Sequence, residues 1–178
     1  MEEVVNELLL QEVNNLRKAK DLHAMEADET LDAIAFDQAE YISKIGKITH
    51  EQESEKKKTL MDRILFYEGL FAQAGENAVM VGVGSKEQIE EGGPRVTINT
   101  EANAVKAAVV SWLDEEEGRL NLLDPNFYKI GSAVIIQENK EIIFVLVTAS
   151  LEYIPSAGVK ISTKFHGIEP FQEEACKS

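Results

Sequence analysis

The residues of this chain that could do acid–base or metal chemistry are few and widely spaced. Its three histidines are His23, His50 and His166. Its carboxylates gather most densely in the run WLDEEEGRLNLLDP at residues 112–125, where positions 114–117 are all acidic. Imidazoles and carboxylates are the groups that act in general acid–base catalysis and that bind divalent metals. The first question is therefore whether this acidic run is a solvated helix end or the wall of a site.

The acidic run follows a segment with strong helical periodicity. Apolar residues recur at i, i+3, i+4, i+7 and i+8 from Val105 to Leu113, with Trp112 among them as an expected core residue. This spacing predicts a helix from about Thr100, with Gly118 as the glycine that ends it in the left-handed conformation. Acids in a last helical turn oppose the helix dipole and cost about 0.3–1 kcal/mol, so four of them there need a structural reason.

His50 and Glu76 are the other candidates. His50 lies in the polar segment KITHE, and a lone histidine of this kind is typical of a surface or hydrogen-bonding residue. Glu76 belongs to Gly75-Glu76-Asn77, directly before an apolar stretch, where a partly buried carboxylate needs a partner. The chain has no phosphate-binding glycine loop and none of the HExxH, CxxC or GxSxG motifs. The sequence thus offers candidate residues without a familiar catalytic motif.

The elements that must position these residues are expected in a definite order. We predict helices at about 2–20, 28–45 and 55–68, the second capped by Asp28 or Thr30 and followed by Gly46. A strand at 78–83 and a surface loop at 84–94 precede the helix that begins near Thr100. Strands at 128–137 and 141–150 form a hairpin, and the second is apolar enough to be buried on both faces. This order predicts an α+β fold with helices packed against an antiparallel sheet.

The chain is expected to form one domain over 1–150, followed by a C-terminal extension at 151–178. The extension holds one more alternating stretch, at 159–166, and a last segment at 172–178 that we expect to be frayed. The single cysteine, Cys176, excludes an intrachain disulfide. No apolar run reaches the roughly 18 residues of a membrane span.

Charge limits the partners and leaves the compartment open. With 18 basic and 32 acidic residues, the formal net charge is −14, which disfavours binding to nucleic acid or to an anionic membrane surface. The one cluster of cations, at 56–58, stands beside three glutamates and is typical of a solvated helix start. The first residues, MEE, are acidic where a secretory signal begins with basic residues. Either the chain acts in the cytoplasm or an export signal has been removed from it.

Seven short segments occur in an order and spacing that resemble a known family. They are Asn14-Asn15-Leu16-Arg17, Asp28–Leu31, Thr49-His50, Gly75-Glu76-Asn77, Ala104-Val105 leading to Ser111-Trp112-Leu113, Gly118-Arg119-Leu120-Asn121-Leu122-Leu123, and Ile130-Gly131-Ser132-Ala133. As a set, they resemble the CAP superfamily, also called the SCP or cysteine-rich secretory, antigen 5 and pathogenesis-related family, in its bacterial disulfide-free branch. The resemblance covers about residues 4–149 and implies a three-layer α-β-α sandwich with a central antiparallel sheet.

The resemblance also implies an open cleft lined by two histidines and two acids, which holds zinc in some members. By position, His50 matches the first histidine, Glu76 the acid of the Gly-Glu-Asn motif, and Glu115 the second acid. Asn77, Arg119 and Asn121 complete the cleft residues, the last two from a His-Arg-x-Asn run. In this chain the histidine of that run is replaced by Gly118.

The missing histidine changes the metal chemistry that we expect. A stable zinc site needs three or four nitrogen, sulfur or oxygen ligands, whereas His50, Glu76 and Glu115 form an oxygen-rich set with a single imidazole. We therefore expect no cofactor, with weak binding of a divalent metal at these three residues, Zn²⁺ or Ca²⁺/Mg²⁺, as the alternative.

Three functions follow as hypotheses. The first is a non-enzymatic, extracytoplasmic binding module with a degenerate cleft, whose ligand is a small lipid, a peptide, a glycan or a protein. The resemblance places such a module outside the cell, in the periplasm or at the cell envelope, after removal of an export signal. The second is a metal-dependent or acid–base hydrolase, such as a peptidase, with Glu76 or Glu115 as the general base and His50 as ligand or acid. The third is an intracellular helical scaffold without a cleft function.

Overall fold

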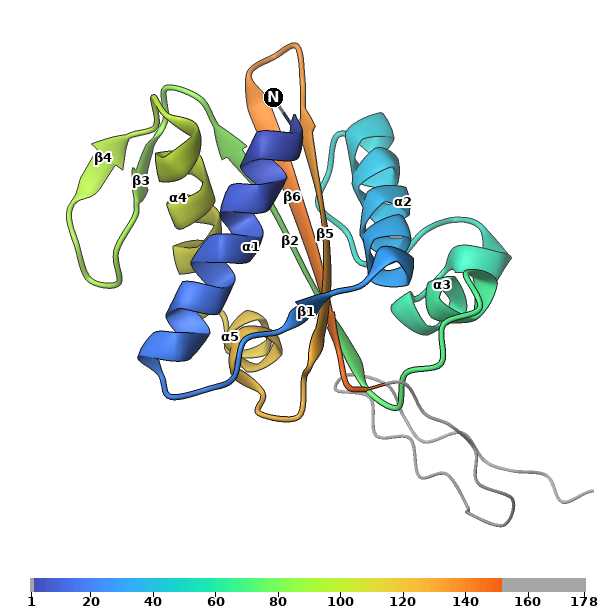
Figure 1. Ribbon diagram of the computed structural model, residues 1–178. Coiled ribbons are helices and arrows are strands. Elements are labelled where there is room, and N and C mark those ends of the chain that lie inside the picture. The colour runs from blue at the N-terminus through green and yellow to red at the C-terminus, as the bar shows by residue number, and fades with distance from the viewer. Residues whose placement is uncertain (1, 152–178) are drawn as a thin grey trace, which may run out of the picture.

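The computed structural model describes residues 2–151, which form three layers (Figure 1). Helices α1, α4 and α5 cover one face of a central sheet, and α2 and α3 cover the other. The predicted α+β class and the α-β-α sandwich are confirmed. The helices span α1 Glu2–Ala19, α2 Glu29–Ile45, α3 Leu60–Phe66, α4 Glu101–Asp114 and α5 Glu116–Leu123, with a short 3-10 turn η1 at Glu55–Lys57.

The central sheet has the strand order β1-β5-β6-β2. Its strands are β1 Glu26–Ala27, β2 Ala74–Gly82, β5 Lys129–Ile136 and β6 Glu141–Ala149, and they pair antiparallel except for the two-residue β1, which runs parallel to β5. β6 is buried along its whole length after Glu141, as its apolar sequence predicts for an inner strand between two helical layers. A separate ribbon of β3 Lys86–Gln88 and β4 Arg95–Thr97 lies within and just after the predicted surface loop at 84–94.

Local capping explains where two of the helices begin and end. Asp28 accepts hydrogen bonds from the backbone N–H groups of Thr30 and Leu31, and Gly46 closes α2 with φ of 67°, both as predicted. The third helix is shorter than predicted. Thr59 and Asp62 form a capping box that starts α3 at Leu60, which separates it from the 3-10 turn at Glu55–Lys57.

The predicted end of the fourth helix at Gly118 is wrong. α4 ends at Asp114, Glu115 is extended with φ −98° and ψ 136°, and α5 begins at Glu116. Glu116 and Glu117 therefore stand in the first turn of a new helix, where the dipole favours acids rather than opposing them. The acidic run is a helix junction, and the electrostatic conflict expected from the sequence does not exist.

Gly118 lies inside α5 and is buried. A Cβ atom on it would come within 2.5 Å of the Trp112 carbonyl oxygen, so glycine is needed there for close contact between α4 and α5. The glycines with positive φ in the described part of the chain are Gly46, Gly84 and Gly92, so Gly118 is not the predicted left-handed helix stop.

One predicted strand begins earlier in the structure than expected, and two predictions concern residues outside the described range. β2 begins at Ala74, four residues before the predicted strand, and so includes the whole Gly75-Glu76-Asn77 motif. None of the helices described here is long and apolar enough to cross a membrane. The predicted strand at 159–166 and the frayed segment at 172–178 lie outside the described residues.

Candidate functional site

Glu76 is the centre of a buried ion pair. Its side chain is 3% exposed, and one carboxylate oxygen, Oε2, accepts a hydrogen bond from the Arg63 guanidinium at 2.5 Å. Its other oxygen, Oε1, lies 2.9 Å from His50 Nδ1. Arg63 is fully buried and also donates to the backbone oxygens of His50, at 3.2 Å, and Lys57, at 3.3 Å. Both carboxylate oxygens of Glu76 are therefore occupied by neighbours from the same protein.

The strand geometry of β2 explains why the Gly-Glu-Asn motif has its composition. Side chains alternate between the faces of a strand, so Glu76 faces α3 while Gly75 and Asn77 face α5. Asn77 donates to the Gly118 carbonyl at 3.0 Å, and Asn121 donates to Asn77 Oδ1 at 2.8 Å. A Cβ atom on Gly75 would come within 2.0 Å of Asn121 Oδ1. Gly75, Asn77 and Asn121 thus fix α5 to β2, and Glu76 makes its side-chain contacts on the other face of the strand.

His50 is presented by a loop between α2 and α3 that side chains hold at several points. Gln38 of α2 donates to the Thr49 carbonyl at 2.5 Å, and Gln52 donates to Asp37 at 2.9 Å and to Gln38 at 3.1 Å. These bonds join the loop to α2, and the Arg63 contact to the His50 carbonyl joins it to α3. The imidazole is thereby fixed above Glu76 while 57% of its side chain remains exposed.

The surroundings of His50 favour its protonated form. The hydrogen bond to Glu76 raises the pKa of His50, and the nearby charges of Glu76 and Glu117 act in the same direction. Partial burial and the charge of Arg63 oppose this increase. The site therefore presents an imidazole with a preference for positive charge, backed by a buried carboxylate and a buried guanidinium.

Comparison with known proteins supports the resemblance seen in the sequence. Residues 10–148 match the cysteine-rich secretory protein family, CAP. This chain belongs to that family. No curated protein matches the chain at the level of sequence.

Several solved bacterial structures share the CAP fold. An extracellular SCP-domain protein of Bacillus anthracis matches with a TM-score of 0.64 and 19% identity, over 84% of this chain and 41% of that one. An outer surface protein of Borrelia burgdorferi matches with a TM-score of 0.62 and 24% identity, over 81% of this chain and 90% of that one. A cysteine-rich secretory protein of Staphylococcus aureus gives 0.58 and 15%, over 84% and 39%. The chain thus spans about two fifths of the Bacillus and Staphylococcus proteins and most of the Borrelia one.

The residues carried over from the CAP cleft fall into three groups. His50 and Glu76 are in contact. Asn77 and Asn121 are also in contact, but both are buried, with exposures of 3% and 7%. Glu115 and Arg119, the remaining two, are exposed at the start of α5.

The donor set does not fit a resident divalent metal. Glu76 has one oxygen on Arg63 and the other on His50, so a metal ligand role would require breaking a buried ion pair. Within residues 2–151, no group of three or more His, Cys, Asp or Glu side chains is arranged to hold a metal ion, so Glu115 does not join His50 and Glu76 in such a group. At the position of the second CAP histidine, the backbone of Trp112 leaves no room for a side chain on Gly118.

Two residues of the site were missed by sequence reasoning. Arg63 carries no motif, and its only signal is an arginine that directly precedes the apolar residues Ile64 and Leu65 of a short helix. Glu117, not Glu115, is the acid of the run whose charge raises the pKa of His50. The resemblance assigns Glu115 as the second acid of the cleft, and that assignment stays a prediction.

Proposed function

We propose that this CAP protein is a non-enzymatic, extracytoplasmic binding module that presents His50 as its polar contact for a ligand. The proposal rests on one observation: both carboxylate oxygens of Glu76 already have hydrogen-bond partners within the protein. A general base must be free to take a proton from a bound reactant, and the Glu76 carboxylate is 3% exposed and bonded on both oxygens.

The exposed part of the site is suited to binding. More than half of the His50 side chain faces solvent, and its raised pKa favours a cationic donor. Such a donor matches an anionic or hydrogen-bond-accepting group on a peptide, a glycan, a lipid headgroup or a protein surface. Glu117 and Arg63 set the charge around it, and neither is placed as a nucleophile.

The location outside the cytoplasm is argued from the relatives. The Bacillus anthracis protein is described as extracellular and the Borrelia burgdorferi protein as an outer surface protein. Both share the fold of this chain. The same placement for this chain predicts that fractionation of the producing cell finds it in the envelope or the medium.

The test of the proposal measures turnover and binding with the same variants. Wild-type protein, His50→Gln and Glu76→Gln are incubated with unfolded casein and a peptide library, and are also applied to glycan and lipid arrays. We expect no cleavage above buffer, together with at least one array ligand that loses about tenfold in affinity in His50→Gln. The exposed substitution Lys56→Gln is the matched control and should bind like the wild type.

Three results would contradict the proposal. Cleavage by the wild type that is abolished in Glu76→Gln would establish the hydrolase alternative. Stoichiometric, sub-micromolar zinc binding in a calorimetric titration would show that the donors rearrange around a metal. Failure of every array ligand to depend on His50 would remove this residue from the binding surface.

A further inference from the structure

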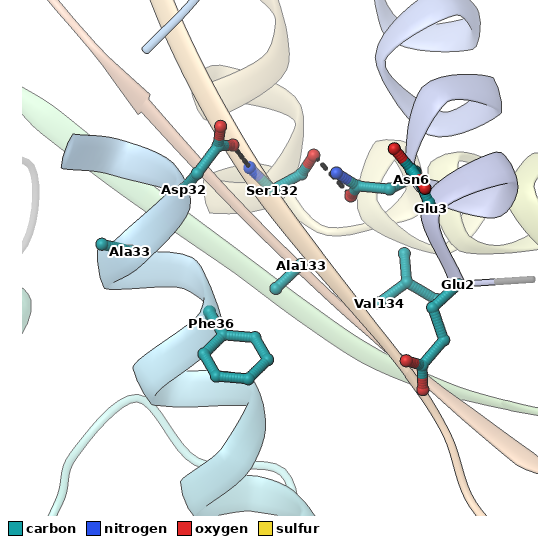
Figure 2. A pocket seen from close by; sticks show the side chains of 9 residues that line it. All are labelled: Glu2, Glu3, Asn6, Asp32, Ala33, Phe36, Ser132, Ala133 and Val134. Carbon is teal, nitrogen blue, oxygen red and sulfur yellow. Dashed lines mark hydrogen bonds between the residues drawn. The ribbon is translucent and has the colours of Figure 1, made fainter. Parts of the chain in front are cut away.

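A second feature lies at the other edge of the sheet, away from Glu76. A cavity of about 470 Å³ opens along β5 between α1 and α2 (Figure 2). The acids Glu2, Glu3 and Asp32 line it, together with Asn6 and Phe36, and its floor is β5 at residues 132–134. None of the residues predicted for the CAP cleft lines this cavity.

The backbone of β5 points hydrogen-bonding groups into this cavity. Gln137 N donates to Glu141 O at 2.8 Å, and in an antiparallel ladder such bonded pairs recur at every second residue. The odd-numbered residues of β5 therefore bond to β6, and Ser132, Val134 and Ile136 turn their N–H and C=O groups away from it. β1 covers β5 only as far as Ile130, so no strand among the described residues pairs with the edge beyond that point.

Side-chain carboxylates occupy part of this edge. The Ser132 N–H donates to Asp32 Oδ1 and the Ile136 N–H donates to Glu2 Oε1, each at 2.9 Å. The Val134 N–H lies between them and points away from β6 by the same ladder, and no side chain among residues 2–151 accepts its hydrogen bond. Natural sheets commonly protect an exposed edge with charged side chains, and here every charged group lining the cavity is an acid.

We propose that the outer edge of β5 is a strand-addition site for an extended segment of a partner protein that carries Lys or Arg on both of its faces. A residue of this segment opposite Val134 exchanges backbone hydrogen bonds with it, as in β-augmentation. The backbone carbonyls of the segment replace Asp32 and Glu2 as acceptors for the N–H groups of Ser132 and Ile136. The released carboxylates then pair with the Lys or Arg side chains of the segment. Phe36, which is 51% exposed, supplies an apolar contact on the α2 side of the segment.

The charge at Asp32 favours a cationic occupant. Burial raises the pKa of Asp32, and the neighbouring carboxylates of Asp28 and Glu29 raise it further, while the hydrogen bond from Ser132 lowers it. A Lys or Arg side chain beside Asp32 would offset both unfavourable effects. An acidic or neutral segment would offset neither, so the three carboxylates select for charge.

The test uses the full chain and a labelled peptide with the sequence KKVKVKK, which has lysines on both faces of the strand and is acetylated and amidated at its ends. We expect saturable binding by fluorescence anisotropy and slower hydrogen exchange of the Val134 amide in the complex. The double substitution Glu3→Gln/Asp32→Asn should weaken binding about tenfold, because it removes two of the three carboxylates and keeps their hydrogen-bond acceptors. Glu90→Gln/Glu91→Gln removes the same charge near the β3–β4 ribbon and should bind like the wild type.

A second peptide separates strand addition from simple charge attraction. Methylation of alternate backbone nitrogens removes the peptide donors needed by the edge, so this peptide should not bind. Equal binding of the methylated peptide would overturn the proposal in favour of nonspecific attraction, and no binding of either peptide would also overturn it.

Two further outcomes would assign the edge to other occupants. Val134 protection in the free protein that is lost in Lys160→Glu/Lys164→Glu would show that this chain's own segment at 159–166 covers the edge. Val134 protection that increases with protein concentration would show that a second copy covers it. Either result would overturn the assignment to a partner protein.

Discussion

Two fully buried arginines, Arg17 in α1 and Arg63 in α3, hold two different corners of this molecule. Arg17 donates to four backbone carbonyls, those of His23, Leu122, Asp124 and Phe127, at 2.8–3.1 Å. Arg63 donates to two carbonyls and to one carboxylate, that of Glu76. The first corner joins α1 to the connection between α5 and β5, and the second joins α3 to β2 and the His50 loop.

The two corners differ in whether the arginine contacts a group that reaches the solvent. Burial lowers the pKa of Arg17, opposed by the charge of Asp124, and its carbonyl partners are neutral main-chain groups. The contacts of Arg17 therefore stabilise the fold. Arg63 instead neutralises a carboxylate whose second oxygen holds an imidazole that reaches solvent. In this protein, the buried arginine that orients a surface group is the one whose partner is a side chain. Arg63 binds Glu76, and Glu76 in turn binds the exposed His50.

The largest expected effect is the loss of the Arg63 charge. Arg63→Met leaves the Glu76 carboxylate buried with only His50 as a partner, and we expect a loss of about 3–5 kcal/mol in the free energy of unfolding. Urea denaturation measures it. Adding Glu76→Gln should restore at least half of the loss, because the unpaired charge is then gone. If the double variant is no more stable than Arg63→Met alone, Arg63 stabilises its corner through the backbone carbonyls, as Arg17 does, and the two corners do not differ.

The Arg17 corner should behave differently in the same experiment. Arg17→Met leaves four carbonyls without their donor, and we expect a loss of about 2–4 kcal/mol, because neutral groups are less costly to leave unpaired than a charge. The matched control is Lys18→Met, an exposed cation on the same helix, which should change stability by less than about 0.5 kcal/mol. Since the partners are main-chain groups, no single second substitution should rescue Arg17→Met. Full rescue by a substitution at Asp124 would show that the carboxylate, not the carbonyls, dominates.

The sequence predicted the frame of the molecule better than its site. The periodicity from Val105 to Leu113 and the uniform burial of β6 are properties of local pattern, so helix and strand positions followed from them. The break at Glu115 was missed because nothing in DEEEG marks one extended residue between two helices. Arg63 was missed because an ion pair between α3 and β2 depends on tertiary packing. His50 and Glu76 were placed by resemblance, and their contact is a fact that only the fold supplies.

A smaller effect tests the corner at Gly118, where the CAP family pattern places a histidine. Gly118→Ala puts a Cβ atom 2.5 Å from the Trp112 carbonyl oxygen, so α4 and α5 must separate and the Asn77 bond to the Gly118 carbonyl must lengthen. We expect a loss of about 1–3 kcal/mol, which is typical of overpacking. Arg119→Ala, at the exposed neighbouring position on α5, is the control. A Gly118→Ala variant as stable as the wild type would show that a side chain fits, and would reopen the question of the second histidine.

The smallest effect is a pH dependence at the Arg63 corner. The pKa of His50 is raised in the folded protein, mainly by its hydrogen bond to Glu76. Protonated His50 therefore stabilises the fold, fully below the unfolded pKa of about 6.5, and this stabilisation is lost as pH rises through the folded pKa. With 57% of the side chain exposed, solvent limits the effect to less than about 1 kcal/mol.

The measurement is the difference in unfolding free energy between wild type and His50→Gln from pH 5.5 to 8.5, which cancels the other titrating groups. The difference should fall with increasing pH, and it should become flat when Glu76→Gln is present in both proteins. A difference that keeps its slope when Glu76→Gln is present would mean that the Glu76 carboxylate, the one feature that the Arg17 corner lacks among its hydrogen-bond acceptors, is not the cause of the pH dependence.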